Sequence, residues 1–292
     1  MISLSFPSCN TGKGAEGGLF ENGIAPRPAK IVHTYGNPHW FYSHHAHVHM
    51  TELIYVAGGE GTYTIDDVPY RVHAGSIVVI NANVTHAVLS DKDAPLDAFN
   101  LGLVGFSVAS LAPACLIGPD ILPLAEADET QAALFDAGMR RILTLRQNGG
   151  AYALAACEAL AGALAAEAAA LFAGAPRMVA ARTDAASVLA HDVLVYLSEH
   201  YREPITLASL ATRFSVSASA IGHAMKARYG VSPIDHLIDC RLTASLWLLI
   251  STDLPVAAVA SQVGFNGARH FSSLFTQRVG VSPTRFRASY RE

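Results

Sequence analysis

The apolar positions in the last third of the chain follow a pattern that occurs twice. A Gly-Val-Ser-Pro segment begins at Gly230 and recurs at Gly280, and apolar residues at helical spacing precede both copies. The matching apolar positions are Ile221, Met225 and Tyr229 in the first copy and Phe271, Phe275 and Val279 in the second. A repeat of this length indicates one supersecondary unit that is used twice.

The first copy predicts two short helices joined by a tight turn. The hydroxyl of Thr206 suits the N-cap of a helix that ends near Phe214, and Ser217 suits the N-cap of a second helix over 218–229. Gly230 is the expected end of that helix, because glycine readily adopts the left-handed conformation of a C-cap. Two helices of this kind, the second with a polar face, are typical of a helix-turn-helix.

The second copy predicts the same arrangement. Pro255 opens a helix over 256–262, a turn follows at 264–267, and a second helix covers 268–279. Between the copies, the Leu-rich segment 234–250 predicts a long helix that fixes the two units relative to each other. The C-terminal part of the chain is therefore expected to be all-α.

The N-terminal half has a different pattern, in which short apolar runs alternate with turn residues. The runs that predict strands cover 53–57, 61–65, 70–72 and 76–80. Turns at 66–67 and 81–83 separate some of these runs, and this spacing predicts a β-sandwich or a β-barrel. The Gly- and Pro-rich residues 1–30 are expected to form a loop or a loosely held arm. The chain as a whole predicts an α+β fold.

Two helices are expected between the barrel and the helix-turn-helix pair. The first covers 124–148, and the second covers 151–173 after a Gly-Gly break. The second helix has apolar residues at alternating gaps of three and four, namely Leu154, Cys157, Ala161, Leu164, Ala168 and Leu171. This seam fits an antiparallel dimer contact, and it equally fits packing against the protein's own barrel.

Segment 151–173 is also long and apolar enough to resemble a membrane span. Glu158 and Glu167 lie within it, and its content of alanine is high, so we expect a buried helix of a soluble protein. The N-terminus has no continuous apolar stretch of the kind that a signal peptide requires. The cysteines are scattered at positions 9, 115, 157 and 240, which indicates reduced thiols in the cytoplasm.

Composition and charge support two unlike domains. Apolar residues make up 51% of the chain and charged residues only 15%, which excludes a disordered protein. Residues 191–292 carry ten Lys and Arg against seven Asp and Glu, whereas the rest of the chain carries a net charge of −7. We expect an effector-binding and dimerisation domain over 1–175, a linker over 176–187 and a DNA-binding domain over 188–292. Because the basic excess is small, few phosphate contacts are expected.

Several motifs in the C-terminal part resemble those of the AraC/XylS-type transcriptional regulators. They are Arg241-Leu242, the Ala260 to Gly264-Phe265 segment, the Phe271-Ser272 to Phe275 run, and the second Gly-Val-Ser-Pro before Phe286-Arg287. Two departures concern the recognition helices: the first offers mostly small side chains, and Phe275 is followed by Thr276 instead of lysine. The resemblance implies two DNA-reading helix-turn-helix units joined by a long helix.

Histidines cluster in the N-terminal part, within 43 residues of one another, at positions 44, 45, 47, 49 and 86. His45 and His47, followed by Glu52 and then Gly59, resemble the first motif of the cupin superfamily, and Gly75 with His86 resembles a degraded second motif. The resemblance implies a small β-barrel with these side chains pointing inward. Strand alternation would place positions 45, 47 and 49 on one face.

Three interpretations of this cluster stay open. His45, His47, Glu52 and His86 form a plausible ligand set for Fe(II), Mn(II), Ni(II) or Zn(II). The same residues with Tyr55 could instead line a pocket for a small-molecule effector that needs no metal cofactor. A His-rich strand can also be simple polar packing at the mouth of a barrel.

The polar positions of the two recognition helices predict the DNA contacts. Arg269 is the expected base reader, since a guanidinium can bind guanine O6 and N7 together. Lys226, Ser217 and Ser272 are expected on phosphates. The further candidates for base contacts are Ser219, His223, His270 and Ser273.

Together these features predict an effector-controlled, sequence-specific regulator of transcription. We expect double-stranded DNA and a small molecule as partners, a homodimer, RNA polymerase as a further partner of an activator, and no membrane. The sequence has no phosphate-binding loop and no nucleophile elbow, so we expect no enzymatic activity. The alternatives are a metal-dependent cupin enzyme, such as a dioxygenase or isomerase, fused to a DNA-binding module, and an adaptor that binds proteins.

Overall fold

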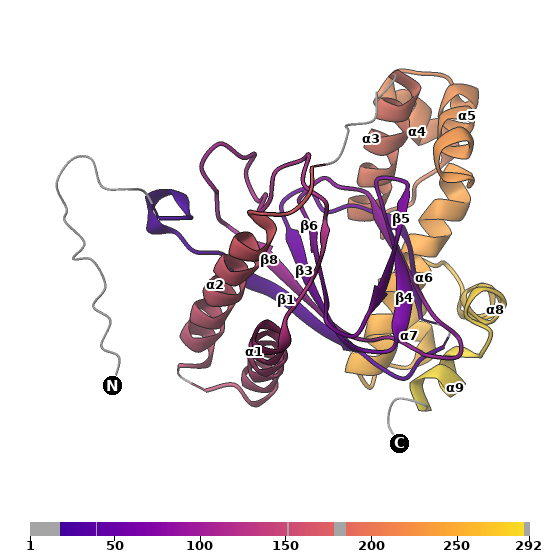
Figure 1. The fold of residues 1–292 in the computed structure, drawn as a ribbon. Coiled ribbons are helices and arrows are strands. Elements are labelled where there is room, and N and C mark those ends of the chain that lie inside the picture. Colours follow the sequence, from indigo (N-terminus) through magenta and orange to yellow (C-terminus); the bar gives the residue numbers. More distant parts are fainter. Residues whose placement is uncertain (1–17, 39, 151, 178–184, 289–292) are drawn as a thin grey trace, which may run out of the picture.

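The computed structural model describes residues 18–38, 40–150, 152–177 and 185–288 of the chain. Its N-terminal half is a barrel of two antiparallel sheets, followed by two long helices, and its C-terminal part is helical (Figure 1). One sheet has the order β1 (Arg27–Thr34), β8 (Asp97–Val104), β3 (Thr51–Gly58), β6 (Ser76–Ile80), β9 (Leu124–Glu126). The other has the order β2 (Phe41–His45), β7 (His86–Ser90), β4 (Glu60–Ile65), β5 (Val68–His73). The predicted α+β fold is confirmed.

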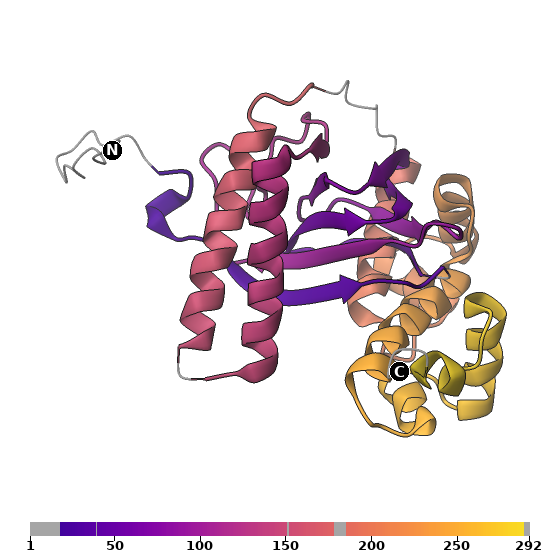
Figure 2. The same ribbon diagram turned by 60° about the horizontal axis from the view of Figure 1, so that its bottom comes forward.

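Strand β3 shows why the barrel sequence reads as short apolar runs. Ile54 and Val56 point into the space between the two sheets, while Leu53 and Tyr55 point to the other side. That other side is covered by α1 (Glu129–Asn148) and α2 (Ala153–Phe172), which lie side by side across it (Figure 2). A strand that is covered on both faces needs apolar residues at every position.

Two turns fix the hairpins of the barrel. Asp66 and Asp67 have φ angles of 45° and 66°, as in the two-residue turns that match the twist of a hairpin, and they join β4 to β5. Gly59, at a φ of 70°, joins β3 to β4, and a Cβ atom there would lie 2.0 Å from the carbonyl oxygen of Pro95. Only glycine fits this position, which accounts for its place in the cupin-like motif.

The apolar seam of α2 packs inside its own chain. Cys157, Ala161, Leu164 and Ala168 are fully buried against α1 and the five-stranded sheet. Of the two interpretations of the seam, packing on the protein's own barrel is confirmed for these four residues. A dimer contact through the helix stays a prediction, and Leu154 at the start of the seam is exposed. By length and composition alone, α2 could cross a membrane; in this structure it is one layer of the N-terminal half.

Two expected element boundaries are wrong. Leu124–Glu126 is the strand β9, paired with β6, so the helix that was predicted to begin at position 124 begins at Glu129, where Asp128 provides a capping box. Arg27–Thr34 is the strand β1, paired with β8, so the predicted loop of residues 1–30 ends earlier. Both errors concern edge strands whose pairing is set by distant partners. Residues 1–17 of the predicted arm lie outside the described residues.

The C-terminal helices follow the predicted repeat closely. They are α3 (Ala185–His200), α4 (Leu207–Phe214), α5 (Ala218–Tyr229), α6 (Pro233–Ser251), α7 (Val256–Gln262), α8 (Ala268–Val279) and α9 (Pro283–Ala288). Thr206 and Ser217 cap α4 and α5 as predicted, and Gly230 ends α5 at a φ of 72°. Helix α3 begins within the predicted linker, of which residues 178–184 lie outside the described residues.

The two helix-turn-helix units, α4–α5 and α7–α8, are joined by α6. Both α5 and α8 lie on the outer side of the molecule, facing away from α1 and α2 (Figures 1 and 2). Arg241 of α6 donates hydrogen bonds to the carbonyl oxygens of Tyr201 and Glu203, at 2.7 and 2.8 Å, which tie α6 to the end of α3. Strand β2, at the edge of its sheet, packs against α6 and α3 and thereby docks the barrel on this helical part.

Candidate effector site and nucleic-acid interface

Four polar side chains from separate segments meet at one end of the barrel. His45 ends β2 and pairs with His86 at the start of β7, while His47 follows in the next loop. Glu52 lies on β3 with its side chain inside the barrel, on the same face as Ile54. One ligand atom of each of the four lies within 4.8 Å of the others. We call this cluster the tetrad.

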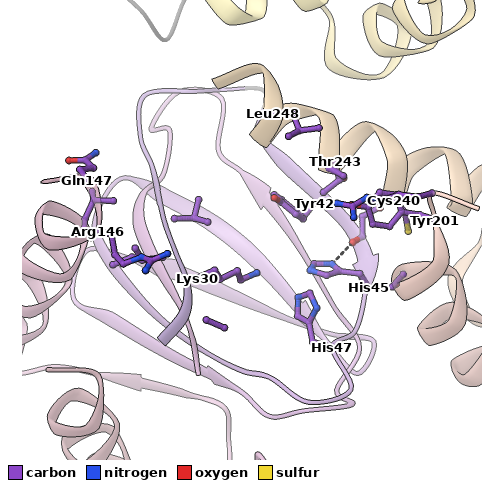
Figure 3. A pocket seen from close by; sticks show the side chains of 18 residues that line it. Lys30, Tyr42, His45, His47, Arg146, Gln147, Tyr201, Cys240, Thr243 and Leu248 are labelled. Atoms are coloured by element: carbon purple, nitrogen blue, oxygen red, sulfur yellow. Dashed lines mark hydrogen bonds between the residues drawn. The ribbon is translucent and has the colours of Figure 1, made fainter. Parts of the chain in front are cut away.

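Backbone carbonyls orient two of the imidazoles. Nδ1 of His45 lies 2.8 Å from the carbonyl oxygen of Ser43 (Figure 3), and Nδ1 of His86 lies 3.0 Å from that of Val84. A carbonyl only accepts, so each Nδ1 carries a proton, and in the neutral ring each Nε2 then has a lone pair. Both Nε2 atoms therefore serve as acceptors or as metal ligands.

Two imidazole nitrogens approach the Glu52 carboxylate without making hydrogen bonds. Nε2 of His86 lies 3.1 Å from Oε2 of Glu52, and Nε2 of His47 lies 3.2 Å from Oε1. Both nitrogens are buried and neither has a partner with hydrogen-bond geometry, whereas the buried Oε1 is ion-paired with Nζ of Lys30. Buried polar atoms without hydrogen bonds are uncommon, and here they converge on one point.

The tetrad places three imidazoles beside an ionised carboxylate. Burial, together with the other two histidines, lowers the pKa of His45 well below its usual value, and burial also lowers the pKa of His47. Burial alone would raise the pKa of Glu52, but the Lys30 ammonium and His86 outweigh it and hold that pKa well below the usual range. Nζ of Lys30 lies 2.5 Å from Oε1 of Glu52.

The chemistry of the tetrad fits a divalent transition metal. Imidazole nitrogens and carboxylate oxygens are ligands that suit Fe(II), Mn(II), Ni(II) and Zn(II). The carbonyl acceptors behind His45 and His86 are the outer contacts that metal-bound histidines usually have. The buried nitrogens without hydrogen bonds are consistent with that use.

Two expected members of the cluster lie elsewhere. Tyr55 points to the opposite face of β3 and stacks on Phe135 of α1, with ring centroids 6.1 Å apart, so its placement among the histidines is wrong. Glu52 and Tyr55 are three residues apart, and in a strand such residues face opposite sides. His49 is exposed in the loop after β2, because the strand that was expected to carry it ends at His45.

A cavity of about 770 Å³ lies at the mouth of the barrel, between the barrel and the C-terminal helices. Its walls come from β1, from β2 and the loop after it, from the end of α1, and from α3 and α6 (Figure 3). Its polar and charged lining includes Lys30, His45, His47, Arg146, Arg202 and Thr243. The space inside the barrel, beside Glu52 and His86, is only about 40 Å³, so an organic ligand fits at the mouth and not within.

The lining of this cavity is cationic and contains an unpaired hydroxyl. Lys30, Arg146 and Arg202 contribute to it, and neither Asp nor Glu does. Oγ1 of Thr243 is buried without a hydrogen-bond partner on the wall that α6 provides. An anionic or polar group of a ligand would satisfy these side chains.

The predicted DNA contacts are accessible on α5 and α8. Ser219, His223 and Lys226 are exposed on α5, and Ser217 is exposed at its N-terminus, where its Oγ accepts a hydrogen bond from the backbone of Ala220 at 3.1 Å. On α8 the exposed residues are Arg269, His270 and Ser273, and Ser272 is half-buried. Ser217 therefore stabilises its helix as well as facing solvent.

Comparison with known proteins identifies both halves of the chain. Residues 32–102 match the cupin domain family, and residues 210–289 match a helix-turn-helix domain family. An uncharacterized helix-turn-helix transcriptional regulator of Escherichia coli K12, YdiP, is 33% identical over 273 residues, which are 94% of this chain and 89% of that protein. The chain belongs to the AraC/XylS family of transcriptional regulators.

Further similarities of this AraC/XylS-type regulator are more limited. The arabinose operon regulatory protein of Escherichia coli K12 is 33% identical over 98 residues, covering 33% of this chain and 34% of that protein. An apo form of ToxT from Vibrio cholerae, a single-substitution variant, aligns over 89% of this chain and 96% of that chain, with a TM-score of 0.51 and 11% identity. The ToxT similarity supports the fold alone.

Sequence reasoning missed most of the cavity of this AraC/XylS-type regulator. Arg146, Arg202 and Thr243 reach the cavity from positions 41 or more residues apart, and no local pattern relates them. A signal is offered by Thr243, one of several buried polar residues of α6, which lies between Leu242 and Leu246. A helix that served only as a spacer would not need a buried hydroxyl there.

Proposed function

We propose that this regulator binds double-stranded DNA through α5 and α8 and that a small-molecule effector in the mouth cavity controls it. One observation supports effector control most directly. The walls of the cavity come both from the barrel, through Lys30 and His45, and from the DNA-binding part, through Arg202 and Thr243. A ligand in this position contacts both parts at once.

Such a ligand would act by favouring one arrangement of the two parts. Its contacts with α6 and with the barrel form together only while the parts are docked as they are here, so its affinity differs between arrangements. The ligand shifts the population by no more than this difference in affinity. We infer an effector with an anionic or hydrogen-bonding group, since the cavity offers Arg146, Arg202 and the Thr243 hydroxyl, while the third cation, Lys30, is paired with Glu52.

The proposed DNA contacts divide into two kinds. Arg269 reads a base in the major groove, and Lys226, Ser217 and Ser272 bind phosphates. Ser219, His223, His270 and Ser273 are the remaining candidates for contacts with base edges. All eight residues are at least partly accessible, which supports these roles.

The proposal extends to the setting in which the regulator works. We place it in the cytoplasm, where the free thiols of Cys115, Cys157 and Cys240 would stay reduced. The working form would be a homodimer, and an activator would also contact RNA polymerase. The proposed division is an effector-binding domain over 1–175, a linker over 176–187 and a DNA-binding domain over 188–292.

A thermal-shift screen of small acids, sugars and aromatic compounds against the full chain tests effector control. A true effector raises the Tm in proportion to ln(1 + [L]/Kd) and changes the affinity for DNA. The Ala244→Phe variant fills the α6 wall of the cavity and should lose both responses. Leu89→Phe, at an exposed site on β7 of the four-stranded sheet, is the matched control. An effector that still acts on Ala244→Phe would show that it binds elsewhere.

The tetrad supports a second candidate role, as a site for a divalent metal. His45, His47, Glu52 and His86 would hold the ion, which would supply a localised positive charge at the floor of the cavity. If such an ion served catalysis, the protein would be a metal-dependent cupin enzyme fused to a DNA-binding module. Metal analysis of the purified protein, combined with assays of oxygen-dependent turnover and isomerisation of small acids and sugars, distinguishes that enzyme from a regulator.

A further inference from the structure

Lys30 stands on the border between the tetrad and the mouth cavity. It projects from β1, lines both the cavity and the small space inside the barrel, and its side chain is 34% exposed. Figure 3 shows it reaching across the floor of the cavity toward His45 and His47. Its ammonium is therefore accessible from the cavity while it pairs with Glu52.

The sheet makes room for the Lys30 side chain. Gly102 of β8 lies opposite Lys30 in the β1–β8 ladder, and a Cβ atom there would lie 2.8 Å from Cγ of Lys30 and 2.5 Å from Sδ of Met50. Glycine inside a strand commonly marks such a close approach. The path of the lysine stem across the sheet is thus part of the fold.

Lys30 supplies the positive charge that balances the tetrad. Nζ of Lys30 lies 2.5 Å from Oε1 of Glu52, and Nδ2 of Asn100 donates a hydrogen bond to Oε2 at 2.9 Å. Each carboxylate oxygen thus has a partner that is not a histidine, an ion pair at Oε1 and a hydrogen bond at Oε2. A divalent ion that binds Glu52 would stand close to the ammonium, and two cations at that distance repel each other.

We propose that Lys30 is a built-in counter-ion that competes with a divalent metal for Glu52, and that metal binding releases the ammonium into the mouth cavity. The proposal rests on the candidate metal role of the tetrad, but it does not depend on effector control. Because one lysine cannot pair with Glu52 and with a ligand at once, a metal on the tetrad and an anion in the cavity would each favour binding of the other.

The test is a metal titration of the full chain, stripped of metal, with Co(II) and with Zn(II). Lys30→Met keeps most of the apolar stem and removes the charge, and it should bind metal at least about tenfold more tightly than the wild type. The Co(II) absorption bands report whether imidazole and carboxylate ligands hold the ion. Lys30→Gln serves as a second neutral variant, and a thermal melt of each variant verifies folding.

Two controls locate the effect. Arg146→Met removes a cation from the same cavity without touching Glu52, and its metal affinity should stay within about twofold of the wild type. His86→Ala in the Lys30→Met background should abolish the binding, because it removes a tetrad ligand. Binding by the wild type as tight as by both lysine variants would overturn the competition by Lys30. Absence of binding in folded variants of Lys30 would overturn the metal role of the tetrad itself.

Discussion

Nε of Arg228, in the last turn of α5, lies 3.3 Å from Oδ2 of Asp67 in the β4–β5 turn. Nη1 of Arg228 also donates a hydrogen bond to the carbonyl oxygen of Ser187, at 3.0 Å, near the start of α3. The neighbouring Tyr229 hydroxyl lies 3.5 Å from Oγ1 of Thr85. The C-terminal end of a proposed DNA-reading helix is thus fastened to the barrel, so a change in the docking of the barrel reaches this helix directly.

We predict that the Arg228–Asp67 pair couples the stability of the barrel to that of the DNA-binding part. In a double-mutant cycle of Asp67→Asn and Arg228→Gln, followed by urea unfolding, the coupling energy should be about 0.5–1 kcal/mol. The value is modest because Asp67 is partly exposed to solvent. Glu60→Gln and Arg71→Gln, an exposed pair within the barrel, form the matched control cycle. Strictly additive effects of the two substitutions would show that the pair contributes nothing.

The sequence predicted the helix-turn-helix units almost to the residue, because the signals that begin and end these helices are local. Ser217 caps α5 through a hydrogen bond to a backbone N–H three residues away, and Gly230 ends it through its own left-handed backbone. The tetrad was also predictable, since the resemblance to the cupin motifs implied that these side chains point into one barrel, although His47 lies in the loop after β2 and not on that strand. Tyr55 failed because the prediction did not apply strand alternation beyond Glu52.

The mouth cavity could not be predicted, because it depends on contacts between distant segments. It exists only where β2 docks on α3 and α6, and Lys30 and Thr243 meet there from positions more than 200 residues apart. The strand β9 was missed for the same reason, since it pairs with β6 across a long connection. Local propensity does not encode such pairings, whereas it does encode caps and turns.

We predict that Arg269 and Lys226 differ in how they affect DNA recognition. With binding sites selected from a random library, Arg269→Ala should lose the preference at one base pair, at a cost of about 1–3 kcal/mol. Lys226→Ala should weaken all sites uniformly and reduce the salt dependence of log K by about one unit. Competition binding against the library measures both effects. A uniform loss with Arg269→Ala would instead place that side chain on a phosphate.

We also predict that the distance between the two half-sites is fixed. Helix α6 has 19 residues, which makes it about 28 Å long. Successive major grooves on one face of DNA lie about 34 Å apart. One protomer therefore places α5 and α8 in both grooves only when the two half-sites have one fixed separation, and a bend in the DNA brings the grooves closer together. Insertion of five base pairs between the half-sites should weaken binding at least about tenfold.

Insertion of ten base pairs separates a rigid connection from a flexible one. Ten base pairs are about one helical turn, so the two half-sites again lie on the same face of the DNA. They are then farther apart than α6 can span, so binding should stay weak. The same insertion outside the site is the control, and gel-shift titrations measure both. Tight binding after ten inserted base pairs would mean that α6 does not hold the two units at a fixed separation.

The last prediction concerns acid stability and a buried histidine. Burial on α6, together with the nearby His44, lowers the pKa of His236 from 6.5 to about 4. Below pH 6.5 the unfolded chain binds a proton at His236, whereas the folded protein does so only near pH 4, so the free energy of unfolding falls as the pH falls through this window. The shift corresponds to a loss of roughly 3 kcal/mol. Urea unfolding at half-unit pH steps measures it.

His236→Gln should remove this share of the pH dependence, because the amide does not titrate. His45 and His47, whose pKa values burial also lowers, act in the same direction in both proteins and cancel in the difference between the two curves. His223→Gln, an exposed site on α5, is the control variant. If the wild type and His236→Gln lose stability in parallel from pH 6.5 to about 4, protonation of His236 does not oppose folding, and the acid sensitivity belongs to other groups.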